Sequence, residues 1–331
     1  LRSDGPSPRD PLPHTAAQFA RAIVMPNLRP PVRTVAEAAA YRQRILDALP
    51  EGMAFEPLMT LYLTDNTPAA EIEAAAASGF VKAVKYYPAG ATTNSDSGVT
   101  DLARCEAVFE ALERTGLPLL MHGEVTDHAV DIFDREAVFI ERHLQRVVEA
   151  YPRLKVVLEH VTTRQGIEFV RKARAGVAAT LTAHHLLLNR NAIFQGGIRP
   201  HAYCLPGLKR EEHRRVLVEA AISGDPKFFL GTDSAPHARH TKEASCGCAG
   251  LYTAHAAIEL YAEAFEDAGA LDRLEGFASF FGPDFYGLPR NTDRIRLLRE
   301  DWAAPESYPF GADTVVPMRA GEVIRWRLAQ G

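Results

Sequence analysis

The stretch "KFFLGTDSAPH", residues 227–237, decides the fold, because a short apolar run with strand character leads directly to an acid and an imidazole. Aromatic and apolar residues in such a short run are typical of a buried strand. Three further apolar runs also lead directly to a polar side chain, which is Lys85, His122 or His160. In a barrel of parallel strands, the carboxyl ends of all strands meet at one mouth. We therefore expect Asp233 and these three side chains to lie close together.

Short apolar segments alternate with amphipathic helical segments along most of the chain. The predicted strands are residues 22–25, 55–63, 81–87, 118–122, 155–160, 177–182 and 227–231, and the predicted helices are residues 35–49, 68–78, 101–115, 135–150, 164–173, 210–223, 253–268 and 271–281. This alternation predicts a parallel sheet with helical crossovers, which fits a doubly wound sheet and a (β/α)₈ TIM barrel. The length of 331 residues favours the barrel.

The number of predicted strands indicates how the chain is organised into domains. Seven strand–helix units fit an eight-stranded barrel if its first strand lies before Leu1. No internal repeat or linker-like composition divides the chain, so we expect one domain over residues 1–331. Residues 301–331 should form a C-terminal tail packed on the barrel.

Composition argues against several classes of partner. The net charge of −5 gives no basic face for nucleic acid, and no apolar run approaches the ~20 residues of a membrane span. The four cysteines are too scattered for a disulfide framework, which favours a reducing cytoplasm. Cys246 and Cys248 lack the spacing of a structural zinc site, and we interpret them as structural thiols.

The residue types at the four strand ends point to metal chemistry. Taken singly, each of Lys85, His122, His160 and Asp233 is more often an ordinary loop residue than a functional one. Together in one cavity, they would be costly to desolvate unless a cation compensated the acid. Imidazole nitrogen and carboxylate oxygen are ligands that suit zinc. The lysine can join them only if carbon dioxide converts its amine to an anionic carbamate.

These four residues resemble the metal cluster of the amidohydrolase superfamily. The flanking motifs are similar to those of dihydroorotases of the smaller, single-function bacterial class. The motifs span most of the chain and read "RAIVMPNLRPPV", "KYYPAGATTNSDSGVT", "LLMHGEVTD", "DIFDREAVFIE", "EHVTT", "NRN", "GGIRPHAYCLP", "LGTDSAPHARHTKEASCGCAG" and "FYGLP".

The resemblance implies a role for each residue of the cluster. Lys85 would be carboxylated and bridge two zinc ions per subunit. His122 and His160 would bind one zinc ion and Asp233 the other. Asp233 would also be the general base that takes a proton from a metal-bridging hydroxide and passes it to the leaving nitrogen.

A second set of residues would hold the substrate by the same resemblance. They comprise side chains for its carboxylate (Arg2, Asn27 and His237), backbone contacts to its ring (Leu205 and Ala249) and hydroxyl donors of a mobile loop that closes over it (Thr92 and Thr93). We interpret His184, His185 and His240 as structural residues.

The function implied is interconversion of N-carbamoyl-L-aspartate and L-dihydroorotate in de novo pyrimidine biosynthesis, by a cytoplasmic homodimer. Two alternatives remain. One is another cyclic amidase, of the hydantoinase or dihydropyrimidinase type, which needs no carboxylate clamp. The other is a non-catalytic barrel that supports a partner enzyme, such as the carbamoyltransferase of the preceding step.

The beginning of the chain departs from the family pattern. Members carry H-x-H just ahead of "LR", where both histidines bind zinc, whereas this sequence opens at Leu1-Arg2 and reads "LRSDG" instead of "LRDG". We expect a preceding segment of ~5–10 residues, the length of a strand, that bears H-x-H. The alternative is a homologue that has lost half of its metal site.

Overall fold

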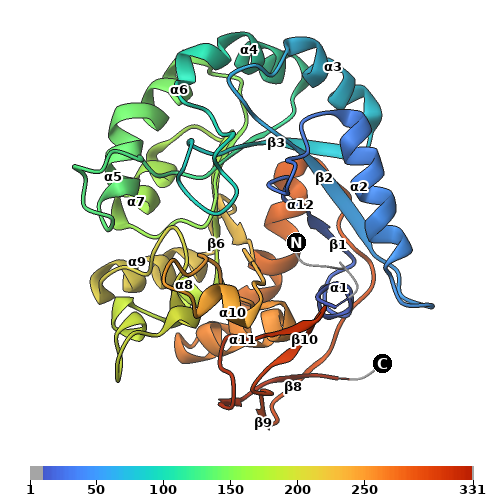
Figure 1. Cartoon of the computed structure of the whole chain (residues 1–331), viewed down its shortest axis with the longest axis vertical. Helices are drawn as coiled ribbons and strands as arrows, with labels where there is room; N and C mark the ends of the chain where they lie inside the picture. Colours follow the sequence, from blue (N-terminus) through green and yellow to red (C-terminus); the bar gives the residue numbers. More distant parts are fainter. Residues whose placement is uncertain (1–9, 330–331) are drawn as a thin grey trace.

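The computed structural model describes residues 10–329, and its main feature is a curved sheet of parallel strands (Figure 1). The strands are β1 (Arg21–Ile23), β2 (Glu56–Tyr62), β3 (Val81–Tyr86), β4 (Leu119–Met121), β5 (Val156–Leu158), β6 (Val177–Leu181) and β7 (Phe228–Leu230). They pair in chain order, from β1 to β7. A doubly wound sheet would reverse its strand order at a switch point. The prediction of a barrel of the (β/α)₈ type is therefore confirmed.

The α-helices of residues 10–329 are α1 (Leu12–Ala16), α2 (Val35–Asp47), α3 (Ala69–Ser78), α4 (Glu106–Thr115), α5 (Arg135–Phe139), α6 (Gln145–Ala150), α7 (Arg164–Lys172), α8 (Ala183–Leu187), α9 (Glu211–Ala221), α10 (Arg239–Lys242), α11 (Ala257–Asp267) and α12 (Phe281–Tyr286). Longer helices such as α2, α3, α4 and α7 cover the outer face of the sheet, whereas α12 lies within its curve (Figure 1). A π-helical turn, η2 (Ile140–Leu144), joins α5 to α6, so the predicted helix over residues 135–150 is one continuous helical rod. The short helices α1, α8 and α10 were not predicted.

The strands are buried on both faces, as expected of a parallel sheet. Side chains that point outward, such as Leu119 and Val156, belong to the main core beneath the helices. Their neighbours Leu120 and Val157 point inward and form a separate inner cluster with Phe229. This strict alternation follows from the two-residue period of a strand.

Helix α12 closes the inner cluster from within the curve of the sheet (Figure 1). Its aromatic residues Phe281, Phe285 and Tyr286 pack against the inward side chains of the strands. The sequence predicted a helix over residues 271–281, and this prediction is confirmed. Helical structure runs without a break from η6 (Leu271–Arg273) through the π-helical turn η7 (Gly276–Phe280) into α12, and so extends beyond the predicted end to Tyr286.

Within residues 10–329, β1 and β7 are the two edges of the sheet, because each pairs with only one neighbour. The gap between them is where the cavity described below extends. No helix in this part of the chain is long and apolar enough to cross a lipid bilayer.

The C-terminal region packs on the barrel through short two-stranded ladders. These are formed by β8 (Leu297–Leu298), β9 (Trp302–Ala303), β10 (Tyr308–Phe310), β11 (Asp313–Val315), β12 (Val323–Ile324) and β13 (Arg327–Leu328). Ile324 is fully buried in the main core. Glu263 of α11 forms ion pairs with Arg319 and Arg325, which ties this region to the barrel.

A buried carboxylate on α5 holds the connection that follows β5. Glu136 accepts hydrogen bonds from the backbone nitrogen and the hydroxyl of both Thr162 and Thr163. The Thr163 hydroxyl in turn caps the N-terminus of α7 by accepting from Gly166 N. Because Thr162 follows His160 by two residues, Glu136 fixes the backbone next to a predicted metal ligand.

We expect Glu136→Ala to lower the free energy of unfolding by about 3 kcal/mol, since several buried donors would lose their acceptor at once. Urea unfolding measures this loss. The control is Glu141→Ala, an exposed position in the same helical rod, which should change stability by no more than about 0.5 kcal/mol. Equal losses in the two variants would contradict the role given to Glu136.

Candidate active site

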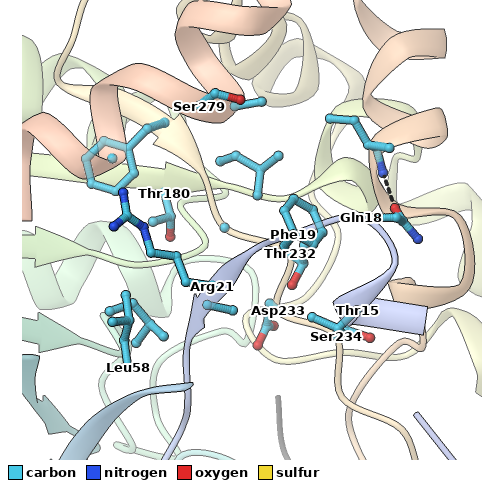
Figure 2. A pocket seen from close by; sticks show the side chains of 18 of the residues that line it. Thr15, Gln18, Phe19, Arg21, Leu58, Thr180, Thr232, Asp233, Ser234 and Ser279 are labelled. Carbon is cyan, nitrogen blue, oxygen red and sulfur yellow. Dashed lines mark hydrogen bonds between the residues drawn. The ribbon is translucent and has the colours of Figure 1, made fainter. Parts of the chain in front are cut away.

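The carboxyl ends of the strands open into one cavity of about 760 Å³. Eight of the residues predicted for the site line it, namely Asn27, Lys85, Thr92, His122, His160, Leu205, Asp233 and Ala249. Figure 2 shows Asp233 and Thr180 directed into the cavity, with Leu58 and Arg21 at another side. The cavity continues between β1 and β7 toward α12, so it has a polar mouth and a more apolar interior.

Lys85, at the end of β3, is almost completely buried. Its ammonium forms an ion pair with Glu159, which follows β5, and lies 4.9 Å from the ring centre of Tyr87. An isolated charge in this position would be costly, and the carboxylate with the aromatic face offsets that cost.

The two predicted histidine ligands lie next to each other. The rings of His122 and His160 are 4.9 Å apart between centroids, in an edge-to-face arrangement. Burial lowers the pKa of His160 well below its usual value, and Lys85 and His122 lower it further. His160 is therefore a neutral imidazole at neutral pH, the form that binds metals. His122 Nε2 lies 2.7 Å from Oε2 of Glu124.

Asp233 follows β7 and faces the same groups. The pKa of its carboxyl is raised to about 6, chiefly by burial and in part by Glu159, while Lys85 and His122 act in the opposite direction. A carboxyl group with such a pKa gains and loses a proton near neutral pH, as a general acid or base must.

The backbone is strained at two of these residues. His160 and Asp233 have φ angles of 44° and 42°, in the left-handed region that residues other than glycine seldom adopt. Such strain persists only where the surrounding structure imposes it, and it is concentrated at functional sites. Here it turns each side chain from the end of its strand toward the mouth of the barrel.

The donor set fits a divalent cation. His160 Nδ1 and Glu124 Oε1 are buried without a hydrogen-bond partner among residues 10–329, and His160 and Asp233 line the same cavity. Buried nitrogen and oxygen donors without partners are unfavourable unless an ion or water satisfies them. Imidazole and carboxylate together suit zinc.

Of the side chains predicted to hold the substrate carboxylate, Asn27 lines the cavity, whereas His237 does not line it and lies behind Ala249, which does. Asn27 donates from Nδ2 to Thr93 O at 3.2 Å, while its Oδ1 has no protein partner in the described part of the chain. His237 donates from Nε2 to Ala249 O at 3.0 Å. Arg2, which was predicted to act with them, lies outside the described residues.

The loop of residues 90–98 folds over the rim of the cavity. Thr93 Oγ1 donates to Ala249 O at 3.4 Å, and Asn94 Nδ2 donates to Asn27 O at 3.2 Å. Only Thr92 of the two predicted threonines lines the cavity. The loop therefore lies in contact with both sides of the rim.

Sequence reasoning missed two acids of the site. Glu159 was noted only as the residue before His160, and Glu124 was not considered. A signal for Glu159 existed, because it occupies the same strand-end position as the other site residues. The contact between Glu124 and His122 could have been suggested by their spacing of two residues in "MHGE".

Hydrogen bonds account for two members of a second group of potential metal ligands, whereas both ring nitrogens of its third member, His184, are buried without a partner among residues 10–329. His184, His185 and Cys204 are buried, with donor atoms within 4.8 Å of one another. His185 is paired through Nδ1 with the Thr182 hydroxyl and through Nε2 with Pro206 O, and the Cys204 thiol donates to the same carbonyl. This agrees with a structural role for His185.

Two other sequence interpretations concern exposed residues. His240 is exposed and its ring is paired with Asp313 of β11, which suits a structural contact. Cys246 is exposed and Cys248 is half-buried, and both thiols are free.

Comparison with known proteins gives the family. The model of the family described as "Amidohydrolase family" matches residues 12–297. The chain belongs to the amidohydrolase family. Its membership accounts for the barrel and for the ring of lysine, histidine and aspartate at the mouth.

Dihydroorotases are similar to this chain over nearly its full length. One from Cupriavidus metallidurans is 68% identical over 316 residues, covering 96% of this chain and 92% of that protein. One from Picosynechococcus sp. is 65% identical over 326 residues, covering 98% and 94% respectively. These identities confirm the resemblance found in the sequence motifs.

A solved structure agrees with these relatives. Dihydroorotase from Saccharomyces cerevisiae, in complex with 5-fluoroorotic acid, superposes with a TM-score of 0.88 at 32% identity, covering 97% of this chain and 92% of that one. Dihydroorotases of the amidohydrolase family depend on bound metal.

The raised pKa of Asp233 predicts a pH-dependent cost in the metal-free protein. Because folding raises this pKa from 3.8 to about 6, folding favours the protonated carboxyl. The cost is absent below pH 3.8, develops as the pH rises to about 6, and is complete above it. Asp233→Asn should therefore stabilise the chelator-treated protein by about 3 kcal/mol at pH 7.5, and by little at pH 4.

Urea unfolding of chelator-treated proteins at the two pH values measures this difference. Asp272→Asn, at an exposed position, serves as the control and should show no comparable change. A gain in stability that is the same at both pH values would contradict the assignment.

Proposed function

We propose that this chain catalyses the reversible cyclisation of N-carbamoyl-L-aspartate to L-dihydroorotate, as a step of pyrimidine biosynthesis. The observation that carries the proposal is the meeting of Lys85, His122, His160 and Asp233 at one cavity. The dihydroorotase names of relatives at 65% and 68% identity support the choice of substrate.

We further propose that two zinc ions per subunit occupy the mouth of the cavity. Lys85, carboxylated at Nζ, would bridge them, with His122 and His160 on one ion and Asp233 on the other. When bound, the metal lowers the pKa of water and polarises a carbonyl group. Carboxylation would replace a cation by an anion, so Glu159, which now contacts Lys85, would have to change its partner.

Asp233 would move the proton in both directions of the reaction. For hydrolysis, its carboxylate accepts a proton from the attacking water and returns it to the ring nitrogen that leaves. For cyclisation, it removes the proton from that nitrogen and gives it to the oxygen that leaves as water. In the metal-free protein burial raises the pKa of this carboxyl to about 6, and a carboxyl that can change its protonation state near neutral pH suits a general acid or base.

Asn27 and His237 would bind the substrate carboxylate, together with Arg2. Asn27 offers a side-chain amide at the rim, His237 would turn its Nε2 donor from Ala249 O to the substrate, and an arginine matches a carboxylate with two parallel N–H groups. The resemblance to dihydroorotases further supports ring contacts from the backbones of Leu205 and Ala249.

The loop that contains Thr92 and Thr93 would exclude water from the bound substrate. Its contacts with Asn27 and Ala249 connect the two sides of the rim, and closure of such a loop strengthens electrostatic interactions within a site. We also propose that the protein works as a cytoplasmic homodimer, on the basis of the same resemblance.

A direct assay tests the reaction. The purified protein supplied with zinc should convert carbamoyl aspartate to dihydroorotate, followed by absorbance of the ring product. Asp233→Asn should lower kcat by about 10²- to 10⁴-fold, since it removes the proton acceptor and a metal ligand. Absence of turnover in the zinc-loaded protein would instead favour a non-catalytic barrel that supports a partner enzyme.

Substrate selection tests the carboxylate clamp. His237→Ala should raise KM for dihydroorotate by about tenfold, because a contact to a charged group is worth about 1.5–3 kcal/mol. The KM for a neutral cyclic imide should remain nearly unchanged. Equal effects on the two substrates would favour a cyclic amidase of the hydantoinase or dihydropyrimidinase type.

A further inference from the structure

Two backbone segments that line the cavity come from separate loops. Leu205 belongs to the connection between α8 and α9, and Ala249 follows α10. Neither residue lies in a strand of the sheet. One backbone hydrogen bond, from Gly250 N to Tyr203 O at 3.0 Å, joins the two segments. The distance between the two segments, and so between the backbone groups that line the cavity, therefore depends on further contacts beside this hydrogen bond.

A buried lysine joins the same two segments. Lys242, the last residue of α10, is 3% exposed. Its Nζ donates to the carbonyl oxygens of Tyr203 at 2.9 Å, Cys248 at 2.9 Å and Gly250 at 2.7 Å. An ammonium has three donors, and all of them are used here. Burial lowers the pKa of Lys242 to about 8, so the side chain still carries its charge at neutral pH.

The segment held by Lys242 also contacts His237. The carbonyl of Ala249, between two of the carbonyls that Lys242 binds, accepts the hydrogen bond from His237 Nε2. The backbone at Gly250 is packed closely against Ala235, since a Cβ atom on Gly250 would lie only 2.7 Å from Ala235 O. A displacement of residues 248–250 would therefore also displace the imidazole of His237.

We propose that Lys242 is a positioning residue of the substrate site, which holds residues 203–206 and 248–250 at the spacing needed to bind the cyclic substrate. Lys242 itself is absent from the cavity lining, so it acts through Leu205, Ala249 and His237. The inference rests on the proposed function, since these are the groups assigned there to the substrate.

The chain offers a matched control for this lysine. Lys227, just before β7, also donates from Nζ to three backbone carbonyls, those of residues 170, 171 and 173 at the end of α7. It does not line the cavity. Lys227→Met therefore removes the same kind of interaction from a part of the fold that does not carry substrate groups.

The experiment compares Lys242→Met with Lys227→Met in zinc-loaded full-length protein. For Lys242→Met, we expect KM for dihydroorotate and Kd for 5-fluoroorotic acid, measured by calorimetric titration, to rise about tenfold. The kcat should fall by less than the KM rises, because Lys242 does not touch the reacting atoms. For Lys227→Met, both KM and Kd should stay within about twofold of wild type, although its Tm falls.

Three outcomes are decisive. Unchanged KM and Kd in a folded Lys242→Met protein would overturn the proposal, as would equal increases in the two variants. If Lys242→Met does not fold, Lys242→Gln, which can reach fewer carbonyls, is judged by the same values. Failure of the wild-type protein to turn over dihydroorotate would refute the proposed function, whereas normal wild-type turnover with an unaffected variant refutes only the role of Lys242.

Discussion

The arrangement of this site depends on the compensation of charge where the parallel strands end. The strands converge because they are parallel and consecutive, and this brings Lys85, Glu159 and Asp233 into one cavity. Lys85 and Glu159 offset each other as an ion pair. The carboxyl of Asp233 forms no ion pair with another residue of the range 10–329, and burial raises its pKa to about 6. A bound cation would relieve this imbalance, which is why a barrel of this kind favours metal chemistry at its mouth.

Apart from Lys85, which lies at the end of β3, the side chains of the site lie on loops, so their positions need support from outside the cavity. His160 and Asp233 hold left-handed backbone conformations that a free loop would not retain. Glu136 binds the segment that follows His160 through four donors. Lys242 binds three carbonyls around Ala249. In both cases a buried charge is stabilised by backbone groups, and it fixes those groups in return.

The two ends of the cavity have different parts in the proposed function. The strand ends provide the groups that any cyclic amidase of the family would need, since attack on a ring amide requires polarisation and proton transfer. In the function proposed here, Asn27, His237 and the loop of residues 90–98 would distinguish one substrate from another. This division places specificity in segments that can change without disturbing the inner cluster of the barrel.

The sequence alone determined the alternation of strands and helices and the residues on which four of the strands end. These features are local, because strand and helix periods are written in consecutive residues, and Lys85, His122, His160 and Asp233 each follow their own apolar run. The longer sequence motifs also indicated the protein family. Only the tertiary structure decided which loops meet. Lys242 binds a carbonyl 39 residues away, and Glu159 binds a lysine 74 residues away. The helix predicted over residues 271–281 extends to Tyr286, and its aromatic rings pack against the inner cluster of the sheet. Such contacts depend on the three-dimensional closure of the sheet, which no local pattern of residues encodes.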